Sequence, residues 1–247
     1  MQKKTKESPK QQDDLSLKNK HLTIHKELYR QRTCFNARFF LYLCRIFTRR
    51  IVIMTKANKV LFITQEITPY VSESEMANIG RNLPQSIQEK GREIRTFMPK
   101  WGNINERRNQ LHEVIRLSGM NLIIDDTDHP LIIKVASIQS ARMQVYFIDN
   151  DDYFQNRLQT SDENGIEYDD NDSRAIFYAR GVLETVKKLR WTPDVIHCHG
   201  WMTALAPLYI KKAYKDEPSF RDAKVVFSVY EDDFKNTLSS DFATKLM

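Results

Sequence analysis

The stretch KVLFIT at residues 59–64 is a short apolar run of β-branched and aromatic side chains. A run of this length and composition is typical of a strand that is buried on both faces. In the next segment, residues 76–87, apolar side chains recur every three or four positions, which predicts a helix that ends near Gly91. Residues 93–98 read as a second strand. The order strand, helix, strand is the unit from which parallel sheets are built.

More strands are expected in the middle of the chain, without helices between them. They cover residues 114–117, 122–124, 131–138 and 144–149, with a turn at residues 128–130, where the sequence reads DHP. Neighbouring strands joined by short turns pair antiparallel. This region therefore predicts an antiparallel or mixed insertion in the sheet.

The last part of the chain returns to alternating helices and strands. We expect a polar loop at 159–172, a helix at 174–189, a strand at 194–198, a helix at 202–214 with a candidate kink at Pro207, and a buried-type strand at 224–229. The whole pattern predicts an α/β fold with a doubly wound, mostly parallel Rossmann-like sheet. Ligands of such sheets bind beyond the carboxyl ends of the strands, so the segments after Thr64, Cys198 and Val229 are the candidate site.

Charge divides the chain into two parts. The formal net charge is +6, but residues 1–53 hold 13 Lys and Arg against 4 Asp and Glu, whereas the remainder holds 25 against 28. We interpret residues 1–53 as a disordered or weakly helical basic extension in front of a domain at residues 54–247. The extension could instead lie on a membrane surface, bind nucleic acid, or lie upstream of a natural start at Met54. For residues 54–247 we expect neither a membrane nor a nucleic-acid partner.

Other function classes are excluded by what the sequence lacks. No apolar run is long enough to span a membrane, and three cysteines are too few for a disulfide scaffold. There is no G-x-G-x-x-G fingerprint, P-loop or metal-spaced Cys/His cluster. His197 and His199 share one strand face without further ligands, so we expect no metal and no cofactor. The acidic runs at 149–152 and 168–172 are interpreted as a solvated turn and a helix N-terminus.

Segments in consistent order and spacing resemble motifs of the bacterial glycogen synthases and plant starch synthases. They are QEITPY at 65–70 (S-E-x-x-P-[FY] in the family), MPKWG at 98–102, VYFIDNDDYF at 145–154, Asp170-Asn171 with Arg174 at a helix start, and WTPDVIHCH at 191–199. The resemblance covers residues 59 to about 231. It implies the N-terminal half of a two-Rossmann glycosyltransferase, which in that family mainly handles the glucan acceptor while the other half binds ADP-glucose.

The sequence departs from this family at the ends of three expected strands. The family's K-T-G-G-L loop, whose Lys neutralises the leaving diphosphate, reads SESEM at 72–76, so Ser72 replaces the Lys and two carboxylates replace small residues. The Asp of H-x-H-D-W is Gly200, and the His of T-x-H-N is Tyr230. Carboxylates repel a diphosphate in a poorly solvated cleft. We therefore expect no catalytic residues and treat Ser72, Gly200 and Tyr230 as degenerate positions.

The resemblance and its departures together predict a cytoplasmic protein of glycogen metabolism that does not transfer glucose. We expect it to act as a glucan-binding or regulatory module. We do not expect ADP-glucose to bind. The expected partners are an α-glucan or maltooligosaccharide and a protein of glycogen metabolism. The candidate glucan contacts are Asp149, Asn150, Asn171, Arg174, His199 and Trp201, whose alternative role is structural. Two other hypotheses stay open: an active ADP-glucose-dependent α-1,4-glucosyltransferase completed by further chain or a partner, and a membrane or nucleic-acid adaptor acting through the basic extension.

Overall fold

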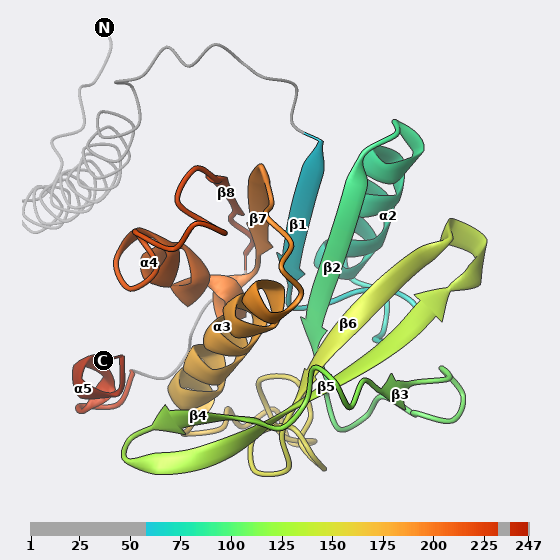
Figure 1. Ribbon diagram of the computed structural model, residues 1–247. Helices are drawn as coiled ribbons and strands as arrows, with labels where there is room; N and C mark the ends of the chain where they lie inside the picture. Colours follow the sequence, from blue (N-terminus) through green and yellow to red (C-terminus); the bar gives the residue numbers. More distant parts are fainter. Residues whose placement is uncertain (1–57, 232–237, 247) are drawn as a thin grey trace, which may run out of the picture. The chain divides into compact units, whose positions relative to one another are not determined.

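The computed structural model describes residues 58–231 and 238–246 (Figure 1). The expectations for residues 1–53 and for a start at Met54 lie outside these described residues. Within them, the chain forms one mixed sheet with helices on both faces.

The sheet has the strand order β3-β5-β6-β2-β1-β7-β8, and β4 pairs with β5 beside this path. The strands are β1 (Lys59–Thr64), β2 (Glu93–Pro99), β3 (His112–Glu113), β4 (Met120–Ile124), β5 (Thr127–Ile138), β6 (Met143–Asp149), β7 (Val195–His199) and β8 (Lys224–Ser228). Strands β6, β2, β1, β7 and β8 run parallel, whereas β5 pairs antiparallel with β3, β4 and β6. The expected parallel sheet with an antiparallel insertion is confirmed.

The helices pack on the sheet as a doubly wound fold requires. They are α2 (Glu75–Glu89), α3 (Asn171–Lys188), α4 (Leu205–Lys211) and α5 (Phe242–Lys245), with 3-10 turns at Gln139–Ala141 and Trp201–Thr203. Helix α2 lies against β1 and β2, and α3 and α4 pack together on the opposite face (Figure 1). From β1 the chain first adds strands on the β2 side of the sheet and later on the β7 side. Because each crossover is right-handed, the helices of the two directions lie on opposite faces.

Close approach of α2 to the loop after β1 depends on one glycine. A Cβ atom at Gly80 would lie 2.3 Å from the Glu66 carbonyl oxygen, so any side chain there would push the helix away from that loop. Met76, Ala77, Gly80 and Pro84 form the buried face of α2. The loop and the helix N-terminus are therefore held together beside the end of β1.

The expected strand at 114–117 is wrong, because that segment is a turn. The amides of Leu117 and Ser118 both donate to the Val114 carbonyl, which closes the turn on itself. Only the two residues of β3 pair with β5. Leu117 is buried and Val114 packs partly buried against the core, while Ile115 is exposed, so the apolar composition of this segment does not indicate a strand.

The expected turn at residues 128–130 is also wrong, because those residues lie inside β5. The hairpin turns instead at Asp125 and Asp126, which have φ of 51° and 59°, and Ile124 pairs with Thr127 across it. Aspartate tolerates this left-handed conformation, which two-residue hairpins require at both central positions. Pro130 ends no strand here.

Two expectations near the end of the described chain need correction. Residues 202–214 do not form one helix: a 3-10 turn precedes α4, and Pro207 lies in the first turn of α4, where its missing N–H breaks no helical hydrogen bond. Strand β8 is not buried, since Val226 and Phe227 are 45% and 38% exposed. Among the described residues no strand pairs with its outer edge, and an apolar run alone does not distinguish a central strand from an edge strand.

Candidate functional site

The carboxyl ends of three neighbouring strands meet, as the sequence predicts. Thr64 of β1 pairs in register with His199 of β7, and His199 pairs with Ser228 of β8. The degenerate positions Ser72, Gly200 and Tyr230 follow these three strand ends in the chain. The structure therefore brings the predicted site segments to one edge of the sheet.

The N-terminus of α2 is capped by its own chain. The Ser74 hydroxyl accepts a hydrogen bond from the amide of Ala77 at 2.9 Å and donates one to the Glu66 carboxylate. Glu75 occupies the first turn, where the helix dipole favours a negative charge. Ser72 and Glu73 are exposed beside it. Side chains of the protein thus satisfy one amide of the first turn and place a negative charge at this helix end.

Gly200 occupies a position where a side chain would be strained and crowded. Its φ is +82°, and a Cβ atom there would lie 2.8 Å from Met76 Sδ and 2.9 Å from Gln65 Oε1. Gln65 is itself fixed, because its side-chain oxygen accepts from the amide of Met202 at 3.2 Å. The aspartate that the family resemblance places at position 200 would strain the backbone here and displace the ends of the Met76 and Gln65 side chains.

Two histidines and a tyrosine close the edge of the sheet at β7 and β8. The rings of His197 and His199 lie 4.0 Å apart, His197 Nε2 is 2.8 Å from Ser228 Oγ, and His199 Nδ1 is 2.8 Å from Tyr230 Oη. Burial, with a smaller contribution from His197, lowers the pKa of His199 to about 4. Burial raises the pKa of Tyr230, and Glu75 adds to that effect. Both groups are therefore neutral at neutral pH, and no described residue bonds to His199 Nε2.

Asp149 and Asn150, two of the candidate glucan contacts, have protein partners. Asp149 is buried and lies 2.8 Å from Lys134 Nζ, while its other oxygen accepts the amide of Asn150. The Asn150 side chain donates to the Pro130 carbonyl and accepts the amides of Asp152 and Tyr153. These bonds fix the turn after β6.

Asn171 and Arg174 are likewise used to hold the start of α3. Arg174 is fully buried, and its guanidinium donates to the carbonyls of Tyr153 and Leu158 and to Asn171 Oδ1. Burial lowers the pKa of Arg174 to about 10, so it stays charged at neutral pH. Asp170 is the N-cap residue, but its carboxylate binds Arg157 and does not bond to a helix amide.

The remaining candidates are the last residue of β7, His199, and Trp201 just after the strand. His199 is fully buried, whereas Trp201 is partly exposed at the start of the 3-10 turn. Glucan contact by any of the six candidates stays a prediction. Trp201 is the one whose side chain reaches the surface in the described structure.

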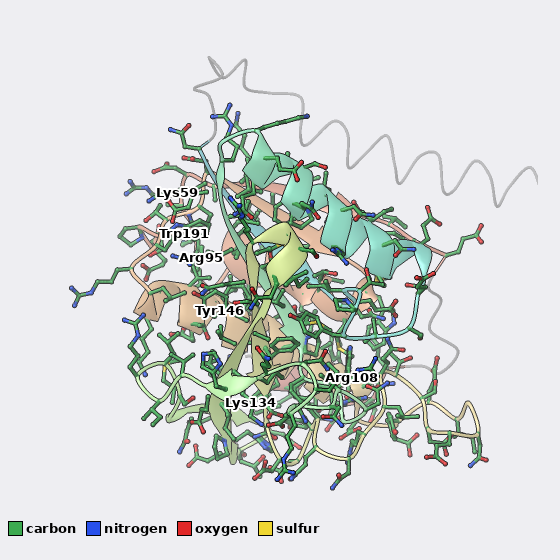
Figure 2. The ribbon with its side chains drawn as sticks, turned by 90° about the vertical axis from the view of Figure 1, so that its right-hand side faces the viewer. Lys59, Arg95, Arg108, Lys134, Tyr146 and Trp191 are labelled. Carbon is green, nitrogen blue, oxygen red and sulfur yellow. The ribbon has the colours of Figure 1, made fainter. Side chains whose placement is uncertain are left out.

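A cavity of about 610 Å³ lies beside the loop after β1, and sequence reasoning did not find it. Pro69, Tyr70 and Ile138 form the less polar part of its lining. The polar lining residues come from α2, from the loop before β3, from the end of β5 and from the 3-10 turn after it. They are Arg81, Arg108, Asn109, Gln110, Ser137, Gln139 and Ser140. Figure 2 shows Arg108 on the side of the molecule that carries the β5–β6 hairpin. A second cavity of about 390 Å³ shares Pro69 and Arg81 with it and is also lined by Ser72 and Glu73. No sequence pattern links these segments, although Tyr70 ends the recognised 65–70 motif.

The described residues contain no group of three or more His, Cys, Asp or Glu side chains arranged to hold a metal ion. None of the described helices is both long enough and apolar enough to span a bilayer. The charged side chains beside the site form ion pairs. Lys134 contacts Glu106 at 2.7 Å, and Lys100 contacts the same carboxylate at 3.1 Å.

Comparison with known proteins identifies the family of the chain. Residues 59–247 match the sequence model of the starch synthase catalytic domain. The chain belongs to the starch synthase catalytic domain family. The resemblance inferred from the sequence motifs is confirmed.

Relatives within this family share much of the chain. It is 40% identical over 179 residues to a glycogen synthase from Pelodictyon phaeoclathratiforme, which covers 72% of this chain and 37% of that protein. It is 40% identical over 173 residues to a glycogen synthase from Chlorobium limicola, covering 70% and 35% respectively. The chain thus spans little more than a third of the length of these relatives.

A solved structure confirms the fold. The catalytic domain of starch synthase IV from Arabidopsis thaliana, determined with ADP and acarbose bound, superimposes with a TM-score of 0.58 at 20% identity. The match covers 70% of this chain and 34% of that one.

Proposed function

We propose that residues 54–247 are a glucan-binding domain of glycogen metabolism that does not transfer glucose from ADP-glucose. The observation that carries the proposal is that Ser74 caps the N-terminus of α2 while a polar cavity lies beside Tyr70. The basic residues 1–53 are proposed to be an extension outside this domain, and the cytoplasm is its proposed location.

The arrangement at α2 supports loss of the donor side. Catalysis of glucosyl transfer requires positive charge or bare amides where negative charge develops on the leaving diphosphate. Here Glu73 of the loop and Glu75 of the first helical turn bring negative charge, the helix is capped by Ser74, and Gly200 has a backbone conformation that strains any other residue. A second polypeptide would not change these three features.

The larger cavity supports retention of the glucan side. Its volume falls in the usual range for small-ligand sites, roughly 300–1,000 Å³. Amide, hydroxyl and guanidinium groups are suited to sugar hydroxyls, which both donate and accept hydrogen bonds. Tyr70 is held in place by edge-on packing against Phe147 at 4.9 Å, so this wall of the cavity is preformed.

The proposal is tested by two measurements on the purified chain. Calorimetric titration with maltoheptaose is expected to show saturable binding in the millimolar range. Incubation with ADP-glucose and glycogen is expected to release no ADP above the buffer level, with the glycogen synthase of Pelodictyon phaeoclathratiforme as the positive control. Glycogen-dependent release of ADP would overturn the non-catalytic proposal, and absence of maltoheptaose binding would overturn the glucan proposal.

An active glucosyltransferase is the second candidate, because the similar proteins are named glycogen synthases. This candidate predicts transfer once the rest of a synthase is supplied. Mixing the chain with a synthase fragment that lacks the matching region would restore ADP release under this hypothesis and would leave it at background under ours. A protein partner from glycogen metabolism stays a prediction, which co-elution with a full-length glycogen synthase tests.

A further inference from the structure

We infer that the cavity beside Tyr70 selects a glucose unit that carries a phosphate group, on a glucan chain or as a free sugar phosphate. The inference rests on the proposed glucan-binding function and specifies the ligand of that site. It comes from the positive charges that line the cavity, which a neutral sugar would not neutralise.

Two guanidinium groups line this cavity and no carboxylate does. Arg81 reaches it from α2 and Arg108 from the loop before β3. Neither forms an ion pair with a carboxylate among the described residues. The cavity therefore carries two positive charges that are available to a ligand.

The nearby carboxylates are directed elsewhere. Glu106 is two residues from Arg108, but its oxygen is bound by Lys134 and Lys100 at 2.7 and 3.1 Å. These two cations hold the pKa of Glu106 below its ordinary value despite partial burial, so the carboxylate stays ionised within that network. Glu73 lines the smaller cavity, not the larger one. An anion is thus favoured in the larger cavity, whereas the smaller one is lined by both Arg81 and Glu73.

Both arginines are positioned by the fold. The Arg81 guanidinium donates to Ser140 Oγ at 2.8 Å through one of its two terminal nitrogens, which ties it to the far wall of the cavity. The turn that carries Arg108 is fixed by Asn105, whose side chain accepts the Arg108 amide at 2.9 Å and whose carbonyl accepts the Asn109 side chain at 2.9 Å. Gln110 ends this turn with φ of 53°.

The other lining groups suit the sugar that carries the phosphate. Asn109, Gln110, Gln139 and the hydroxyls of Ser137 and Ser140 are neutral donors and acceptors. Burial raises the pKa of Tyr70 to about 12, an effect that the positive charge of Arg81 partly offsets. The phenol therefore stays protonated, and it can donate to a phosphate or sugar oxygen. Phosphate oxygens accept charge-assisted hydrogen bonds from guanidinium groups, which are stronger than those to a neutral hydroxyl.

The test compares phosphorylated and neutral probes by calorimetry on the whole chain. The probes are maltotriose, maltotriose 6-phosphate, glucose 6-phosphate and inorganic phosphate. We expect maltotriose 6-phosphate to bind about tenfold or more tightly than maltotriose, and the Arg81→Gln and Arg108→Gln variants each to remove most of that preference. Arg107→Gln is the matched control, because Arg107 is exposed in the same turn and does not line the cavity.

The outcomes separate this inference from the function on which it rests. Tighter binding of maltotriose 6-phosphate than of glucose 6-phosphate identifies a phosphorylated glucan chain as the ligand, and the reverse identifies a free sugar phosphate. Equal binding of maltotriose and its phosphate overturns the inference and leaves the glucan-binding function intact. Binding of inorganic phosphate as tightly as the sugar phosphates overturns it as well. Thermal melting checks that each variant is folded.

Discussion

At the scale of single residues, packing as well as charge shapes the candidate site. Gly200 shows this most clearly, because its φ of +82° strains any other residue and a Cβ atom there would lie 2.8 Å from Met76 Sδ. A side chain at position 200 would therefore require Met76 and Gln65 to move.

We predict that Gly200→Ala destabilises the protein by more than the backbone strain alone. A non-glycine residue at positive φ costs about 1–3 kcal/mol, and the contact with Met76 Sδ adds overpacking of similar size. Chemical denaturation of the variant measures the sum.

Gly165→Ala is the matched control, because Gly165 has φ of +77° and a Cβ atom added there would have no other atom within 4 Å. We expect Gly200→Ala to cost clearly more than Gly165→Ala, and Met76→Ala to relieve part of the difference in the double variant. Equal costs at the two glycines would show that the Met76 contact is unimportant.

The pH dependence of stability follows from His199. Its pKa falls from an ordinary value of 6.5 to about 4 on folding, chiefly through burial. Below pH 6.5 the unfolded chain takes up a proton that the folded chain refuses until about pH 4. The stabilising contribution is therefore complete above pH 6.5 and is lost as the pH falls toward 4.

We expect the His199→Gln variant to lose less stability than the parent protein between pH 7 and pH 4.5, as measured by urea unfolding at each pH. His112→Gln is the control, because His112 is exposed on β3. If the two variants and the parent protein share one pH profile, buried His199 is not the source of the acid sensitivity.

At the scale of elements, the α2 N-terminus is the feature on which the interpretation of the donor side depends. A helix end normally offers unpaired amides to an anion. Ser74 satisfies the amide of Ala77, and its hydroxyl is held by Glu66. The cap and the loop after β1 thus stabilise each other.

We predict that Ser74→Ala lowers the free energy of unfolding by about 1 kcal/mol, the usual cost of losing an N-cap. Ser86→Ala is the matched control, since Ser86 is exposed inside the same helix and its side chain caps nothing. Equal effects of the two substitutions would mean that the capping bond contributes nothing measurable.

Strands β1, β2, β6 and β7 could be predicted from sequence because each is short, contains apolar or β-branched residues and is bounded by turn residues or helices. The turn of the β4–β5 hairpin could not be placed correctly, because it uses two aspartates in the left-handed conformation while a nearby proline gives the stronger turn signal. The exposure of β8 could not be predicted, since burial depends on neighbours that composition does not specify. The cavity could not be predicted either, because Arg81, Arg108 and Ser140 come together only in the folded chain.

At the scale of the whole molecule, the chain is a family domain that spans little more than a third of its relatives' length. Beside the strand ends, Ser74 caps α2, Met76 crowds Gly200, and Tyr230 bonds to His199. A polar cavity lies nearby, beside the loop after β1. Predicted contacts such as Arg174 and Asn150 support the scaffold around this edge. The domain therefore keeps the fold of its family.

The most direct test is a crystal structure of the chain soaked with both ADP and maltotetraose. We predict an ordered oligosaccharide in the cavity lined by Tyr70, Arg81 and Ser140, and no nucleotide at the N-terminus of α2. An ordered diphosphate bound to the amides beside Ser74, or a cavity without sugar, would contradict this prediction.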